Sequence, residues 1–280
     1  MSTEDCSYSE TRNNRMKKSI EKITYCFVII AALFVSFVSF VEPLVMKDIN
    51  ITKVILVLLC YAAVFAGSLT LFRRLSERTL YYLTIAGIFA AVIVQTYIVF
   101  HMRLVPKVDL NHIYDYCVDL GGSRIIRYKE SKYFAYNTNN IPLAIVIYYV
   151  FRMAAFTGID YRIAAGLFNV LLILVMYVSA FLILKKVTTI RTTAVYMALL
   201  LTNPSFYAYA SYYYTDTISA GLVMAAVCFI IYGCYKKKNH WKMIHFLAAG
   251  FLIGFATCIR VTSIFIVLAV GVWILLNKYW

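Results

Sequence analysis

An all-α bundle of transmembrane helices is the fold class that the sequence predicts, and composition and regularly spaced apolar runs carry this prediction. Of the 280 residues, 62% are hydrophobic and 14% are charged, and the mean hydropathy is +0.77. A soluble domain carries about 25% charged residues, so the composition excludes a soluble globular protein, a disordered chain and a disulfide scaffold. The net charge of +14 matches the Lys and Arg that cytoplasmic loops of membrane proteins accumulate.

The N-terminal tail, residues 1–22, is polar and basic, and we expect it to be cytoplasmic. The apolar run 23–41 is too long for the apolar core of a cleaved signal sequence. It is therefore expected to open a transmembrane domain that covers residues 23–280. The runs 51–72 and 79–100 each have the roughly 20 residues that a span needs, and a basic loop separates them. The third span then leaves the membrane at its outer face.

Residues 101–140 interrupt the apolar pattern and form a long polar loop, which parity places outside. A connection of this length is typically functional. Between Asp109 and Leu120 the residues recur at helical spacing, which predicts a short helix lying on the membrane surface.

Further apolar runs follow this loop and bring the total to about eight or nine hydrophobic segments. The later runs are 141–156, 163–184, 192–210, 217–235, 244–258 and 261–277.

One conflict arises in this topology. The basic clusters 185–191 and 236–242 should both be cytoplasmic, which requires an odd number of crossings between the outer loop and the first cluster, yet two runs lie there. We expect the short run 141–156 to cross incompletely or at a strong tilt; the alternative is that one basic cluster lies outside.

Ionisable side chains are rare in the last part of the chain. Asp216 is the one acidic residue after position 160, and Arg260 stands between the last two apolar runs. Parity places both at the outer face together with Asp109. Each has a simple structural alternative: Asp109 as a solvated loop carboxylate, Asp216 as the N-cap of the next helix, and Arg260 as a side chain reaching the lipid headgroups.

Motifs for metals and nucleotides are missing from the sequence. The cysteines and histidines have no metal-ligand spacing, and neither a P-loop nor a dinucleotide-binding motif is present. We therefore expect no metal and no cofactor.

Three short motifs carry a resemblance to a known family. The first is Val-Asp-Leu-Asn-His-Ile-Tyr, which contains Asp109. The second is Tyr-Phe-Ala-Tyr-Asn-Thr-Asn-Asn-Ile-Pro-Leu at 133–143, similar to the family element Tyr-Phe-x-x-Tyr-Pro-Asn-Asn. The third is Tyr-Tyr-Thr-Asp216, followed later by Gly-Phe-Ala-Thr-Cys-Ile-Arg260. In this order, over roughly residues 100–277, the chain resembles the GT-C type membrane glycosyltransferases, specifically the family of protein O-mannosyltransferases and aminoarabinose transferases.

The resemblance implies an inverting glycosyltransferase that moves a sugar from a polyprenyl-phosphate donor to an acceptor at the outer face of a bacterial plasma membrane. Asp109 would be the catalytic general base, Arg260 would stabilise the phosphate leaving group, and Asp216 would orient Arg260 or the acceptor. Further donor- or acceptor-binding positions are Asn139, Asn140 and Tyr214. The scheme requires no metal.

The chain departs from the family in two respects. Family members begin the outer loop after one span, whereas three are counted here, and they are usually longer, so we expect the N-terminal part of a longer protein or a short member. Two other functions stay open: a transporter or flippase of a lipid-linked solute, and a non-catalytic subunit of a cell-envelope complex. The glycosyltransferase hypothesis requires Asp109, Asp216 and Arg260 to converge on one cavity at the outer face.

Overall fold

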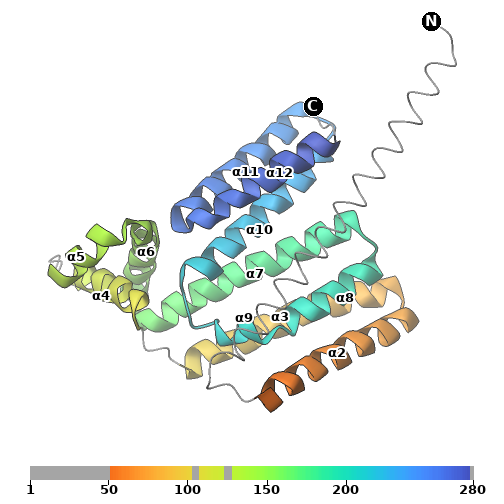
Figure 1. The fold of residues 1–280 in the computed structure, drawn as a ribbon, viewed down its shortest axis with the longest axis horizontal. Helices are drawn as coiled ribbons and strands as arrows, with labels where there is room; N and C mark the ends of the chain where they lie inside the picture. The colour runs from red at the N-terminus through yellow and green to blue at the C-terminus, as the bar shows by residue number, and fades with distance from the viewer. Residues whose placement is uncertain (1–50, 103–106, 123–127, 278–280) are drawn as a thin grey trace, which may run out of the picture. The chain divides into compact units, whose positions relative to one another are not determined.

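A computed structural model describes residues 51–102, 107–122 and 128–277, and every regular element within them is a helix, as the sequence predicts (Figure 1). The predicted tail 1–22 and first span 23–41 lie outside the described residues.

The chain divides into two units, Met1–Ala63 and Val64–Trp280. Helix α2 (Ile51–Arg74) contains the boundary. The arrangement of helices described below concerns the second unit.

Five of the described helical segments are long and apolar enough to cross a membrane. This supports a polytopic helical membrane protein. The five are α3 (Glu77–His101), α6 (Ile141–Thr157) with the short η1 (Thr138–Asn140) before it, α7 (Tyr161–Val187), α10 (Thr215–Cys234) and α11 (Asn239–Ile259).

Helix α7 runs antiparallel to α3. Near the start of α3, Tyr81 packs on Phe181 near the end of α7, with ring centroids 5.7 Å apart. At the other end of α3, Val99 packs against Gly166 near the start of α7. The side chain of Asp160 begins α7 by accepting hydrogen bonds from two backbone N–H groups of its first turn.

Helix α10 runs parallel to α7, and α11 returns antiparallel to α10. Gly221 packs directly on the backbone of α7, and Tyr232 near the end of α10 donates to the carbonyl of Leu182. At the same end, Phe229 lies beside His245 of α11, with ring centroids 5.9 Å apart. Helix α12 (Phe265–Asn277) follows α11 after a 3₁₀ turn and packs on α10 and α11.

The basic clusters gather at one end of these helices, which we call the basic end. The ammonium group of Lys185 lies 4.6 Å from the ring centroid of Tyr81, and that of Lys186 lies 4.2 Å from the ring centroid of Tyr235. These contacts bring together the end of α7, the start of α3 and the end of α10. The opposite end is where α7 and α10 begin and α11 ends.

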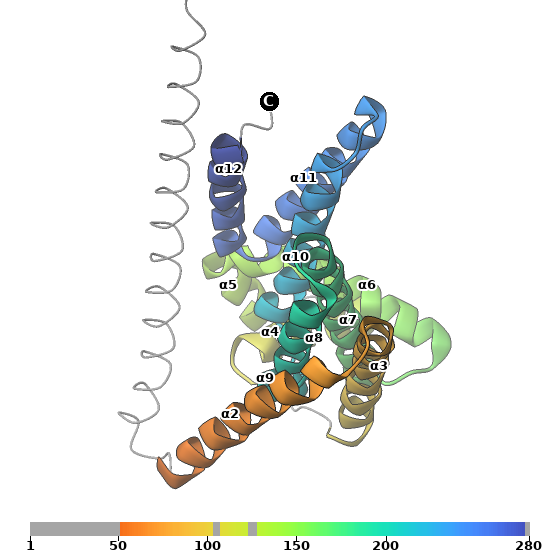
Figure 2. The ribbon, with the colours of Figure 1, turned by 90° about the vertical axis from the view of Figure 1, so that its right-hand side faces the viewer.

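Helix α6 starts and finishes at this opposite end. Its first turn places Leu143 in one apolar cluster with Ile218 and Ile259, from the start of α10 and the end of α11. Its last turns place Phe151 against Tyr161 at the start of α7, with stacked rings 4.8 Å apart. Figure 1 views α6 nearly end-on, whereas α7, α10 and α11 are seen along their lengths; Figure 2, turned by 90°, shows α6 from the side.

Helix α6 therefore lies across the bundle, although its length and composition alone would allow it to cross a membrane. The run 141–156, for which the sequence predicts an incomplete or strongly tilted crossing, is this transverse helix.

The run 192–210, predicted as one span, is two short helices, α8 (Ile190–Leu201) and α9 (Pro204–Ala208). Pro204 has no backbone N–H and cannot continue α8. The side chain of Asn203 accepts from the N–H of Ser205 at 3.0 Å and begins α9 instead.

Two fully buried amide side chains satisfy the backbone that this break exposes. Gln95 of α3 donates to the carbonyl of Phe206 at 3.3 Å. Asn169 of α7 donates to the carbonyls of Tyr209 at 2.8 Å and Ala210 at 3.0 Å. An unbonded carbonyl in an apolar environment costs several kcal/mol, so these amides make the irregular segment compatible with the bundle.

Gly221→Ala is expected to destabilise the protein, because a methyl group there would lie 2.5 Å from the carbonyl oxygen of Leu172. Such overpacking costs about 1–3 kcal/mol. Thermal unfolding of the detergent-purified protein measures the effect. Gly250→Ala is the matched control, since nothing lies within 4 Å of its added methyl group; equal melting temperatures for the two variants would contradict the close approach of α7 and α10.

Asn169→Leu is expected to lower the free energy of unfolding by about 1–3 kcal/mol, because the buried carbonyl of Ala210 loses its donor, whereas the carbonyl of Tyr209 keeps the backbone N–H of Tyr212 at 3.0 Å. The same thermal unfolding measurement checks this. Leu171→Ala changes an exposed side chain of the same helix and should leave the melting temperature nearly unchanged. A melting temperature for Asn169→Leu close to that of the unmodified protein would show that these bonds do not hold the segment.

Candidate functional site

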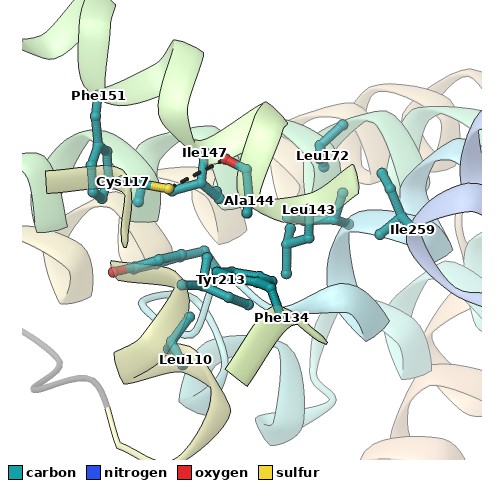
Figure 3. Packing of buried hydrophobic residues seen from close by; sticks show 13 residues of the cluster. Leu110, Cys117, Phe134, Leu143, Ala144, Ile147, Phe151, Leu172, Tyr213 and Ile259 are labelled. Carbon is teal, nitrogen blue, oxygen red and sulfur yellow. Dashed lines mark hydrogen bonds between the residues drawn. The ribbon is translucent and has the colours of Figure 1, made fainter. Parts of the chain in front are cut away.

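Helix α4 (Asp109–Gly122) lies where the sequence predicts a surface helix, and apolar packing fixes its position. Leu110, Ile113 and Cys117 are fully buried in one cluster with residues of α6. Cys117 donates to the carbonyl of Ala144 at 3.2 Å. Figure 3 shows Tyr213 beside Leu110 in this cluster. The packing sets the place of the first residue of α4, the carboxylate Asp109.

Asp109 accepts a hydrogen bond from the phenol of Tyr214, with 3.1 Å between the two oxygens. The residue before it, Val108, has a backbone φ of +53°. A β-branched residue in this left-handed region is a conformational outlier and costs on the order of 1–3 kcal/mol. The strain lies at Val108, immediately before Asp109 begins α4.

Tyr133 provides a second phenol beside Asp109. It lies in α5 (Tyr128–Tyr136), and its ring stacks on His112 with centroids 4.3 Å apart. Burial, together with the charge of Asp109 and a hydrogen bond to it, raises the pKa of Tyr133, while the hydrogen bond from Asn140 opposes this rise.

Asn140 and Asn139 have different environments. Asn140 is 2% exposed and donates to the phenol oxygen of Tyr133 at 2.6 Å. Asn139 is exposed and donates to the side-chain oxygen of Asn140 at 3.3 Å. The arrangement makes Asn140 a support for Tyr133 and leaves Asn139 as the asparagine that faces outward.

Burial raises the pKa of Tyr214 to about 12, with further contributions from its hydrogen bond to Asp109 and from the charge of that carboxylate. Tyr133 and Tyr214 are therefore both protonated at neutral pH, and Tyr214 donates its proton to the hydrogen bond with Asp109. A carboxylate has about four lone-pair sites, so Asp109 keeps the capacity to accept a further proton or hydrogen bond.

Arg260 forms a two-point ion pair with Asp216. Its Nε lies 2.9 Å from one carboxylate oxygen, and its Nη1 lies 3.1 Å from the other. Nη1 also donates to the hydroxyl of Thr215 at 3.1 Å. Asp216 is not an N-cap, since Tyr214 holds that position before α10. The sequence-based alternative of Asp216 as a cap is therefore wrong, and Asp216 pairs with Arg260 instead.

The geometry leaves the outer nitrogen of Arg260 available. Arg carries five N–H donors, and Nε and Nη1 account for the three bonds to Asp216 and Thr215. Within the described part of the chain, Nη2 has no hydrogen-bond partner. With side-chain exposures of 40% for Arg260 and 60% for Asp216, the pair is open to an anion from outside.

Consecutive residues connect the two groups. Tyr214 bonds to Asp109, whereas Thr215 and Asp216 bond to Arg260. The pKa of the neighbouring Tyr212 is raised, mainly by burial. The charges of both carboxylates, Asp109 and Asp216, add to the rise. The sequence-predicted residues thus gather at the opposite end of the bundle.

Sequence reasoning missed three contributors. Tyr133 begins the Tyr-Phe-Ala-Tyr motif, but its bond to Asn140 depends on how α5 meets η1. Tyr212 and Thr215 flank predicted residues, and the run of three tyrosines before Thr215 was the one available signal. His112 lies one turn after Asp109 in the sequence, but nothing there predicts its stacking on Tyr133.

Within the described residues, no group of three or more His, Cys, Asp or Glu side chains could hold a metal ion. No protein-family model, curated protein or solved structure matches the chain. The fold and site define a helical membrane protein in which a carboxylate bonded by a phenol adjoins an open arginine–carboxylate pair.

Replacement of Arg260 by Gln is expected to change the free energy of unfolding by at most about 1 kcal/mol, because exposed ion pairs contribute little. Asp216→Asn should change the free energy of unfolding by a similarly small amount. Thermal unfolding measures the stability of both variants. A loss of several kcal/mol in either variant would mean that the pair holds the fold together, and a functional role would then lose its support.

Proposed function

We propose that this protein is a membrane glycosyltransferase that moves a sugar from a polyprenyl-phosphate donor to an acceptor hydroxyl at the outer face of the membrane. The observation that carries the proposal is the linkage of Asp109 to the Asp216–Arg260 pair through Tyr214 and Thr215. The motifs that resemble the protein O-mannosyltransferase and aminoarabinose transferase family contain Asp109, Asp216 and Arg260, which lie far apart in the sequence.

Asp109 is the general base of the proposed reaction. The acceptor oxygen attacks the anomeric carbon while its proton passes to Asp109. The bond from the anomeric carbon to the phosphate oxygen breaks, and its electron pair stays on the phosphate. Because attack occurs opposite the leaving group, the anomeric configuration inverts. The phenol of Tyr214 donates to the carboxylate and that of Tyr133 lies near it, which supports a fixed direction for proton transfer.

Arg260 stabilises the phosphate as negative charge develops on it. Its Nη2 supplies two donors, and Asp216 keeps the guanidinium plane in one orientation. The exposed Asn139 and the phenol of Tyr214 are suited to bind sugar or acceptor hydroxyl groups. Asn140 acts through Tyr133 rather than on the ligand.

The positive-inside rule supports the orientation. The basic end carries Lys185, Lys186 and the cluster 236–238, so it would be cytoplasmic. The segment 101–140, with α4 and α5, would then lie at the outer face, where a polyprenyl-phosphate sugar can enter from the membrane.

A transporter receives less support. Ion and proton relays place ionisable side chains within spans. In α3, α7, α10 and α11, Asp, Glu, Lys and Arg occur only in the turns near the helix ends, whereas the transverse α6 carries Arg152 within it.

Asp109→Asn should reduce sugar transfer at least about 100-fold, because removing a general base costs about 10²–10⁴ in rate. The assay follows radiolabelled mannose from polyprenyl-phosphate-mannose into acceptors, in membranes that contain the full chain. Polyprenyl-phosphate-glucose serves as a parallel donor.

Asp160→Asn is the matched control. It changes a carboxylate at the same end of the bundle, and Asn is an equally good helix N-cap, so transfer should be unaffected. Unchanged transfer by Asp109→Asn would remove Asp109 from the proposed role. Absence of transfer by the unmodified chain with both donors, at normal expression, would count against the proposed enzyme.

A further inference from the structure

A cavity of about 290 Å³ lies at the opposite end of the bundle, among α4, α6 and the start of α7. Its walls include the aromatic rings of Tyr148, Phe151 and Tyr161, and its charged lining residue is Arg152. The stacking of Phe151 on Tyr161 fixes one wall, and buried Cys117 of α4 lines the inside. None of these residues belongs to the Asp109 and Arg260 site.

Arg152 has no anionic partner among the described residues. The ion pair of the described residues joins Asp216 to Arg260, which do not line the cavity. The nearest acidic side chain along the chain, Asp160, accepts hydrogen bonds from the first turn of α7. A second guanidinium, that of Arg162, lies 5.5 Å from the ring centroid of Tyr114. Arg152 is therefore the charged side chain that lines the cavity, and the oppositely charged Asp160 and Arg162 flank its lining residue Tyr161.

The hydroxyl of Tyr213 is a buried donor without a hydrogen-bond partner in the described structure. Figure 3 shows it on the side of Cys117 and Phe151, two residues that line the cavity. Burial raises the pKa of Tyr213, and Tyr114, Cys117 and Arg162 are among the neighbours that influence it. Tyr213 is not a lining residue, so its hydroxyl lies behind the cavity wall, and Arg152 is the charged lining group that would pair with an anion.

The outer surface of α6 beside Arg152 is apolar. Tyr149, Met153 and Phe156 are exposed, with Phe156 94% exposed. At helical spacing these positions adjoin Arg152. Because α6 lies across the bundle, a lipid whose headgroup meets Arg152 could lay its acyl chains along this stripe.

We propose that the cavity binds the phosphate headgroup of an anionic membrane phospholipid, with Arg152 pairing to the phosphate and Tyr148 and Tyr161 enclosing it. Arg binds phosphate through two parallel N–H donors. The volume lies near the lower end of ligand pockets, which suits a headgroup while the acyl chains stay outside. This site is separate from the proposed donor site and does not depend on transferase activity.

The test uses the full chain, purified and delipidated in a neutral detergent. Short-chain phosphatidylglycerol, short-chain phosphatidylcholine and inorganic phosphate are titrated separately, and the rise in melting temperature gives each dissociation constant. We expect phosphatidylglycerol to bind at least about tenfold more tightly than phosphatidylcholine. Equal affinity for the two lipids would overturn the proposal, as would inorganic phosphate that binds as tightly as phosphatidylglycerol.

Variants assign the binding to this cavity. Arg152→Gln should weaken phosphatidylglycerol binding at least about tenfold, and Arg191→Gln, which changes an exposed arginine at the basic end, should not. Ala155→Leu keeps Arg152 but fills part of the cavity and should weaken binding as well. Each variant must melt cooperatively before lipid is added. Unchanged binding in both cavity variants would overturn the assignment.

Discussion

The break between α8 and α10 imposes the constraint on which the site depends. Residues that leave a helix inside an apolar bundle must find hydrogen-bond partners for their carbonyls, and water cannot supply them. Gln95 and Asn169 do so from two different helices. Their bonds tie the irregular backbone to α3 and α7. The segment that follows, from Tyr212 to Asp216, therefore has a fixed position, and it carries the residues that contact both Asp109 and Arg260.

Buried and exposed polar groups have different roles in the site. Asn140 is almost fully buried and is committed to Tyr133, whereas the Asp216–Arg260 pair stays open to solvent. A buried amide with a fixed partner adds rigidity, because leaving it unpaired would be costly. An exposed ion pair contributes little stability, but it can exchange solvent for an anionic ligand at low cost. Rigid support behind an open charged surface is the arrangement that binding of a phosphate requires.

Much of this architecture follows from the sequence. Apolar runs predicted the helices, and the spacing after Asp109 predicted α4. The dipeptide Asn203-Pro204 was a local signal for the break within 192–210, since Asn-Pro marks turns. The apolar composition of the whole run nevertheless favoured a single span. The burial of Asn140 could not be predicted, because two adjacent asparagines have the same chemistry and only the packing of α5 on η1 separates them. The pairing of Arg260 with Asp216 likewise depends on α10 and α11 being neighbours, which no local pattern specifies.

The transverse course of α6 gives the two proposed sites a common element. Asn140, immediately before α6, supports Tyr133, and Arg152 lines the cavity twelve residues later, about 18 Å along a helical path. A helix is stiff over this length, so the position of one site relative to the membrane constrains the other. A phospholipid headgroup held at Arg152 would fix the depth of α6 at the interface. The phenol beside Asp109 would then stand at a defined height above the acyl chains, which is the geometric condition for meeting a lipid-linked phosphate.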